Sequence, residues 1–203
     1  VRAPLPMGSG EIDVAFGDLL ALRARNTNGQ TGVRVVLGRN EVKDAPPASG
    51  LVATGRTGTL DAMEWVAVAR GGSGEGDGLP LRHVDVTADR LLMIGSVFPD
   101  TRLQLAPAQQ ALAVSLDGDA LSGALMVPDA KGATIAGKLA RVHWRKAAPT
   151  GVTVAEGPVR NATDDINPAD VPPLSLDVED LRFGNARLGA AKLRTRQQAD
   201  GLY

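Results

Sequence analysis

The chain of 203 residues predicts an all-β fold, a long antiparallel β-meander with at most one or two short helices. Apolar residues recur at every second position in short runs, which is the pattern of half-buried strands. Gly, Asn and Asp residues of the kind that form tight turns end most of these runs. The apolar pattern also occurs twice along the chain, which is typical of repetitive β-structure.

The repeat has a constant spacing of 90 residues, for example from Val84 to Leu174 (174 − 84). Each copy begins with a proline step and continues with alternating apolar residues, a break and a second alternating run. The matched positions are Val84, Val86, Leu91, Met93 and Leu103 in the first copy and Leu174, Leu176, Leu181, Phe183 and Leu193 in the second. The repeated residues are apolar, so the pattern indicates strands and an extended surface rather than a catalytic cluster.

The first segment, residues 1–70, predicts several strands and one short helix. Turn signals follow the strand candidates at 16–18, 26–29 and 38–40, and 41–50 is a proline-bearing loop before a strand candidate at 51–55. The alternating residues are Ile12, Val14, Phe16, Leu20, Leu22, Val33, Val35 and Leu37. Leu60, Met63 and Ala67 then have helical spacing, and Asp61 is a suitable N-cap, so we expect a short helix at 60–69.

The rest of the chain predicts two more β-repeat segments and two linkers. Residues 71–78 form a Gly-rich connector, residues 79–146 a second β-repeat segment, residues 147–170 a polar linker and residues 171–203 the start of a third, truncated segment. Within 79–146 we expect strands near 82–89, 91–97, 101–106, 111–117, 120–127, 132–139 and 140–145. Turns are expected at 117–119 and 128–132. We interpret the chain as an internal fragment, truncated at both ends.

Composition excludes several functional classes. Apolar residues make up 43% of the chain, enough for a large core, whereas aromatic residues make up only 3%, too few for the stacking platforms that bind single-stranded nucleic acid. The 22 Lys and Arg residues balance the 23 Asp and Glu residues, so charge gives no reason to expect nucleic acid. The absence of cysteine excludes disulfides and thiolate chemistry.

An extended sheet with one apolar face must close, pair with another sheet or curl to shield that face. A strongly curved sheet leaves an apolar groove suited to acyl chains, which need a dry trough without unpaired polar groups. The alternating residues therefore either line such a groove or form an ordinary β-core. The groove candidates are Ile12, Val14, Phe16, Val84, Val86, Leu103, Leu105, Leu112, Val114, Leu116, Leu174, Leu176 and Val178.

Polar residues give no catalytic or metal-binding pattern. His83 and His143 are the only histidines, and both lie in predicted strands, so we expect ordinary strand residues, no metal, no cofactor and no enzymatic activity. The acidic turns lack the ligand series of a calcium loop. Arginines scattered along the strands predict a solvated face, with a minority at a groove rim positioned for lipid phosphates. They are Arg23, Arg25, Arg141, Arg145, Arg182, Arg187, Arg194 and Arg196.

One segment resembles a known family. Residues 171–189 read P-x-L-x-L-x-V-x-D-L-x-x-G-x-x-x-L-G from Pro172 onward, which is similar to the repeated segments of YhdP-type proteins in the AsmA-like group, relatives of TamB. The step Leu60-Asp61-Ala62-Met63-Glu64-Trp65 and the acidic stretch 164–170 fit the same family. The connector 71–78 departs from the family pattern by its high glycine content.

The resemblance implies a fragment of a long protein anchored in the inner membrane of Gram-negative bacteria, with this stretch in the periplasm. It implies a long curled sheet, a "taco" with a hydrophobic groove, that moves phospholipids between inner and outer membranes and supports the outer-membrane barrier. The expected partners are phospholipid acyl chains and the parent protein, with dimerisation through sheet edges or the apolar face as another way to cover that face. The alternative is a structural β-repeat, a spacer or adhesin-like module without a ligand.

Overall fold

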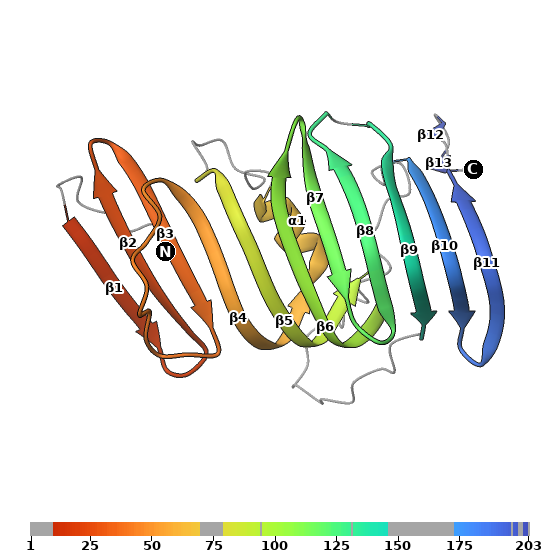
Figure 1. The fold of residues 1–203 in the computed structure, drawn as a ribbon, viewed down its shortest axis with the longest axis horizontal. Helices are drawn as coiled ribbons and strands as arrows, with labels where there is room; N and C mark the ends of the chain where they lie inside the picture. Colours follow the sequence, from red (N-terminus) through yellow and green to blue (C-terminus); the bar gives the residue numbers. More distant parts are fainter. Residues whose placement is uncertain are drawn as a thin grey trace, which may run out of the picture.

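The computed structural model describes residues 10–69, 79–93, 95–130, 132–145, 173–195, 197–198 and 201–202. Eleven strands form one open sheet in chain order, from β1 at one edge to β11 at the other (Figure 1). Among the residues just given, a single short helix, α1 (Ala62–Ala69), lies behind the sheet in this view. The predicted all-β fold is therefore confirmed. The connector 71–78 and the linker 147–170 fall outside the described residues.

The strands of the large sheet vary in length, and the longest lie near its centre. They are β1 (Gly10–Phe16), β2 (Leu20–Thr27), β3 (Gln30–Leu37), β4 (Gly50–Asp61), β5 (Leu81–Met93), β6 (Ser96–Ala108), β7 (Ala111–Asp117), β8 (Leu121–Pro128), β9 (Ile135–Trp144), β10 (Leu174–Phe183) and β11 (Ala186–Arg194). A separate two-stranded sheet pairs β12 (Gln197–Gln198) with β13 (Gly201–Leu202).

The sheet is mostly antiparallel, but three neighbouring pairs are parallel, which corrects the expected uniform meander. The parallel pairs are β3–β4, β4–β5 and β9–β10. Parallel neighbours require a connection that returns along the full strand, whereas a hairpin needs only a few residues. The three pairs occur where the chain has its long connections, at 38–49, 62–80 and 145–173. The sequence predicted connecting segments in these three places but did not predict that the strands they join are parallel.

The short turns follow from residues that tolerate positive φ. Asn28 and Gly29 have φ of 53° and 76° and join β2 to β3, as expected of an Asn-Gly hairpin. The predicted turns at 16–18, 117–119 and 128–132 also connect consecutive strands. Asp61 caps α1, because its Oδ1 accepts hydrogen bonds from the backbone N–H groups of Met63 (2.8 Å) and Glu64 (3.3 Å).

Several expected strand ends lie inside longer strands. The runs predicted at 82–89 and 91–97 are not two strands, because β5 continues to Met93 and the turn to β6 follows it. The runs at 132–139 and 140–145 are likewise the single strand β9, and the strand expected at 51–55 extends to Asp61. In each case the apolar alternation changes phase without ending the strand.

This phase change marks a bend that crosses the sheet. In β5 the buried residues run Val84, Val86 and Ala88 and then skip two positions to Leu91. Asp100, opposite on β6, has a φ of 40°, and register irregularities occur in β8–β9 and in β10–β11. An extra residue in a strand bends it and increases its twist. The strands curve visibly in Figure 1.

The bend brings distant strands together and closes the core. Phe98 near the start of β6 meets Trp144 at the end of β9 edge to face, with ring centroids 6.3 Å apart. The Ser96 hydroxyl donates a hydrogen bond to the Arg145 carbonyl oxygen at 2.7 Å. Leu91, Phe98 and Leu121 are fully buried. Trp65, Val66 and Ala69 of α1 pack against the same core, so α1 and the bent strand ends lie on one face of the sheet, here called the inner face.

The opposite, outer face is covered at one end by the loop 38–49. The Arg34 Nε donates a hydrogen bond to the Ala45 carbonyl oxygen at 2.9 Å, and Val42 is 3% exposed. A Cβ on Gly32 would lie 1.7 Å from the Pro47 carbonyl oxygen, so only glycine permits this contact. Figure 1 shows this loop crossing in front of β2 and β3.

A substitution at Gly55 tests the close approach between β3 and β4. Its φ is +117°, and an added Cβ would lie 2.2 Å from the Leu37 carbonyl oxygen of the neighbouring strand. Gly184 has a φ of +59° but nothing within 4 Å. We expect Gly55→Ala to lower the free energy of unfolding by about 3 kcal/mol or more and Gly184→Ala by about 1 kcal/mol, measured by urea denaturation. Equal losses would show that the close approach at Gly55 is unimportant.

Candidate functional site

The inner face carries a row of apolar residues that crosses all eleven strands. Starting from Val14 on β1, each residue faces the next across the ladder until Leu193 on β11. The row is Val14, Leu22, Val35, Ala53, Val84, Leu105, Val114, Leu125, Gly137, Leu176 and Leu193, one residue from each strand. We call it the central row. Polar side chains are absent from it throughout.

A second row beside it has the same character. It runs from Phe16 on β1 to Ala191 on β11 and also takes one residue from each strand. Its members are Phe16, Leu20, Leu37, Gly55, Val86, Leu103, Leu116, Gly123, Leu139, Val178 and Ala191. The register thus joins the alternating runs of separate strands into one continuous apolar strip.

The strand register places all thirteen groove candidates on the inner face. Eight of them are buried in the core, namely Val84, Val86, Leu103, Leu105, Leu112, Val114, Leu116 and Val178. The other five, Ile12, Val14, Phe16, Leu174 and Leu176, lie on the first strand or near the last and are partly or fully exposed. Whether these residues line a lipid groove stays a prediction.

Exposure along the strip divides it into a packed centre and two open flanks. Val84 and Leu105 in the centre are 1% and 0% exposed, whereas Val14 and Leu193 at its ends are 36% and 46% exposed. The centre is where α1 and the bent strand ends cover the sheet. In the flanks, formed by β1–β3 and β10–β11, the edge strands β1 and β11 lack such cover among the described residues, whereas Ala24, Val33 and Val178 on the other strands of the flanks are buried.

Sequence reasoning missed several members of the strip. Leu22, Val35, Ala53, Leu125 and Leu193 belong to the central row but were not among the candidates. All except Ala53 stand in alternating runs or in the repeat, and these were the available signals. Cross-strand register was needed to connect them, because a strand shifted by one residue would present its other face.

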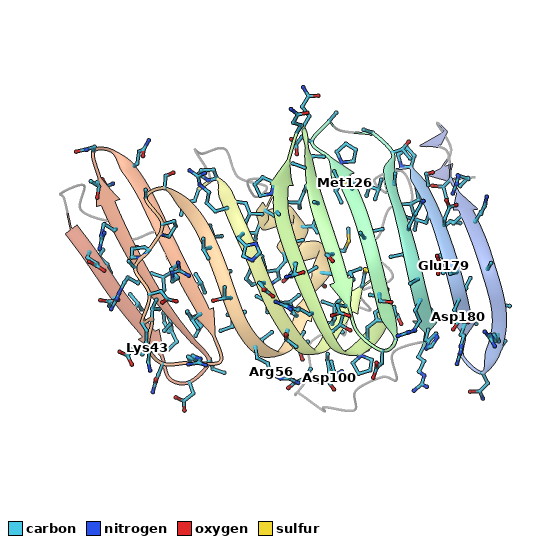
Figure 2. The ribbon with its side chains drawn as sticks, in the orientation of Figure 1. Lys43, Arg56, Asp100, Met126, Glu179 and Asp180 are labelled. Atoms are coloured by element: carbon cyan, nitrogen blue, oxygen red, sulfur yellow. The ribbon has the colours of Figure 1, made fainter. Side chains whose placement is uncertain are left out.

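The outer face is polar and joined by cross-strand ion pairs. Arg102 on β6 forms two hydrogen bonds to the carboxylate of Asp85 on β5, and they lower the pKa of Asp85 below its ordinary value. Arg194 binds Asp177 at 2.8 Å, which lowers the pKa of Asp177 in the same way. Arg56 pairs with both Asp89 and Asp100 at the bend, and Figure 2 shows Arg56 beside Asp100. Cross-strand ion pairs of this kind stabilise neighbouring strands, and their charged groups suit a solvent-exposed face.

Both histidines lie on the outer face as partly exposed strand residues. His83 lies 4.0 Å from Asp85, and the His143 Nε2 lies 3.1 Å from the Asp180 carboxylate. Asp180 also binds Arg182 (3.0 Å) and Arg187 (3.2 Å). The hydrogen bond with His143, followed by that with Arg182, lowers the pKa of Asp180 from 3.8 to about 2.

A shallow depression of about 680 Å³ also lies on the outer face, where side chains are small. Its lining includes Ala106, Ala113, Ala124 and Ala136 together with the charged residues Lys138 and Asp177. Met126, labelled in Figure 2, is the large apolar side chain of this area and is 43% exposed. Across the described ranges, no group of three or more His, Asp or Glu residues could hold a metal ion, and no helix could span a membrane.

The chain matches a known protein family. The family model described as "YhdP protein" matches residues 2–203, which is nearly the whole chain. No curated protein and no solved structure matches.

Acid titration tests the ion pairs around Asp180. Because the pKa of Asp180 is lower in the folded protein than its ordinary value, the ionised carboxylate stabilises the fold above about pH 4, and this contribution is lost as the pH falls towards 2. We expect Asp180→Asn to be less stable than the wild type at pH 6 and nearly equal to it at pH 2, by urea denaturation. Asp18→Asn, in the exposed β1–β2 turn, is the control. A constant gap for Asp180→Asn across this range would contradict the assignment.

Proposed function

Since the chain belongs to the YhdP family, we propose that it is a periplasmic segment of an inner-membrane-anchored protein that carries phospholipids between the inner and outer membranes. In this proposal the inner face holds the acyl chains, and the transport supports the outer-membrane barrier. The segment acts by binding and passing lipids, without catalysing a reaction.

The central row is the observation that carries the proposal. Its ten steps between neighbouring strands, at about 4.8 Å each, give a length of about 48 Å. One leaflet of a bilayer has a hydrocarbon thickness of about 15 Å, half of the roughly 30 Å core. The apolar strip is therefore much longer than one lipid tail, which suits a path better than a pocket for a single ligand.

The chemistry of the strip suits movement. The backbone N–H and C=O groups of the inner strands are paired in the sheet ladder, so the floor presents few donors or acceptors to an acyl chain. Contact with aliphatic side chains is non-directional and contributes about 0.8 kcal/mol per buried CH₂. A lipid that moves between equivalent apolar positions exchanges equal contacts, so the protein need not supply a specific interaction at each step.

The packed centre requires a route past α1. The buried side of α1 seals the strip there, and its other side exposes Met63 and Val68, each 52% exposed. A helix that is apolar on both sides normally has partners on both sides. In our proposal acyl chains cross the centre over Met63 and Val68 and lie directly on the sheet at the two flanks.

The packed centre also supports a second candidate, a structural β-repeat without a ligand. A core of Val84, Val86, Leu103 and Leu105 alone would stabilise such a spacer. The exposed flanks distinguish the two, because a spacer gains nothing from Phe16 at 60% and Leu193 at 46% exposure.

The sheet edges are proposed partner surfaces. β1 and β11 each have one unpaired side in the eleven-stranded sheet. Unpaired strand edges readily pair with further strands. We propose that strands of the parent protein, or a second copy of the chain, continue the sheet there.

Two exposed apolar residues on opposite faces test lipid binding. Leu193 on the inner face and Met126 on the outer face are 46% and 43% exposed. We expect Leu193→Glu to reduce co-purified phospholipid several-fold, because a carboxylate cannot lie against acyl chains, and Met126→Glu to leave it unchanged. Lipid extraction and mass spectrometry measure the amount per protein. Absence of phospholipid from the wild type, or equal loss in both variants, would favour the spacer.

A further inference from the structure

Several cationic side chains gather around Asp180 on the outer face, away from the proposed lipid path on the inner face. We propose that His143, Arg182 and Arg187, gathered on Asp180 at the outer face of β9–β11, form a binding site for a phosphate group. We call these four residues the Asp180 cluster. The proposal rests on charge and geometry and stands independently of lipid transport along the inner face.

Strand pairing holds the cluster in place. His143 and Arg182 face each other across the parallel pair β9–β10, and Arg182 faces Arg187 across β10–β11. Three side chains from three adjacent strands therefore meet one carboxylate. The contacts are His143 Nε2 at 3.1 Å and Arg182 at 3.0 Å on Oδ2, and Arg187 Nε at 3.2 Å on Oδ1.

The cluster carries an excess of positive charge. Asp180 supplies one negative charge, whereas Arg182 and Arg187 supply two positive charges even with His143 neutral. The other ion pairs on the outer face of the described sheet are balanced or acidic: Arg102 with Asp85, Arg194 with Asp177, and Arg56 with two carboxylates. Glu179, the next acid along the chain and labelled in Figure 2, takes no part in the contacts of the cluster. An additional anion would therefore be attracted to this part of the face.

The hydrogen-bond donors of the cluster exceed its acceptors. Each guanidinium has five N–H groups, and Asp180 can accept only about four hydrogen bonds in all. The Arg182 Nε is enclosed and has no acceptor among the described residues. An enclosed donor without a partner is costly, and a modest rotation of Arg182 towards an oxyanion would remove that cost. Two adjacent arginines match the planar, multidentate recognition of phosphate oxygens.

The cluster lies at the end of β10, next to an apolar residue of the inner face. Phe183, the last residue of β10, faces Trp144 of β9 and is 61% exposed. A phospholipid with its tails near Phe183 would have its phosphate within reach of the strand end that carries Arg182. The phosphate group recognised here therefore belongs either to a lipid headgroup, which rests on the proposed function, or to a free phosphate ion.

Titration of the full 203-residue chain with two probes tests the site. The probes are inorganic phosphate and a short-chain phosphatidylglycerol below its micelle concentration, with binding followed by calorimetry at low salt. We expect Arg182→Gln and Arg187→Gln each to weaken binding about tenfold, because each removes a charge-assisted hydrogen bond. We expect Asp180→Asn to tighten it, because the competing carboxylate is gone.

Arg194→Gln is the matched control, because it removes one positive charge from the same face outside the cluster. The opposite effect of Asp180→Asn cannot result from misfolding. Binding of both probes supports recognition of the phosphate group itself, and binding of the lipid alone supports a headgroup site. Binding of inorganic phosphate alone supports an anion site. The proposal is overturned if neither probe binds the wild type, or if Arg182→Gln and Arg187→Gln bind as tightly as Arg194→Gln.

Discussion

An open sheet with one largely apolar face must keep that face from water, and the rest of the fold depends on how it does so. The strands bend near Ala88 and Asp100, where the apolar alternation changes phase, and the bend brings Phe98 of β6 onto Trp144 of β9. Helix α1 fills the space inside the bend. Burial of each large aliphatic side chain contributes about 1.5–3 kcal/mol, so the covered centre supplies much of the stability.

The same solution leaves the ends of the strip exposed. Val14 and Phe16 at one end and Leu193 at the other continue the pattern of the core without its cover. The centre thus anchors the fold and the flanks remain free for apolar ligands or for neighbouring strands. The outer face has the opposite character, with Asp–Arg pairs from Arg102 to Arg194 that hold adjacent strands in register and remain in water. The sheet with these two different faces is the fold of a chain that belongs to the YhdP family.

Alternation and turn residues were enough to predict the β-fold, the hairpins and the Asp61-capped helix, because these are local properties. The 90-residue repeat also has a physical basis. The skip from Ala88 to Leu91 recurs from Val178 to Leu181, where the ladder is irregular, so both copies encode a bent strand. The sequence did not predict the parallel pairs or the path of α1, because both depend on where long connections return. It also did not separate buried Val84 from exposed Val14, because exposure depends on what lies above the sheet.

The most direct test of the inner face as a lipid path is a photo-crosslinking scan of β1 with phospholipid. A photoreactive amino acid is placed in turn at each position from Glu11 to Phe16. All of these residues except Ile12 are exposed, so accessibility alone predicts similar labelling along most of the strand. The account predicts a period of two, with lipid attached at Ile12, Val14 and Phe16 and little at Glu11, Asp13 and Ala15. Uniform labelling, or none at the inner positions, would contradict it.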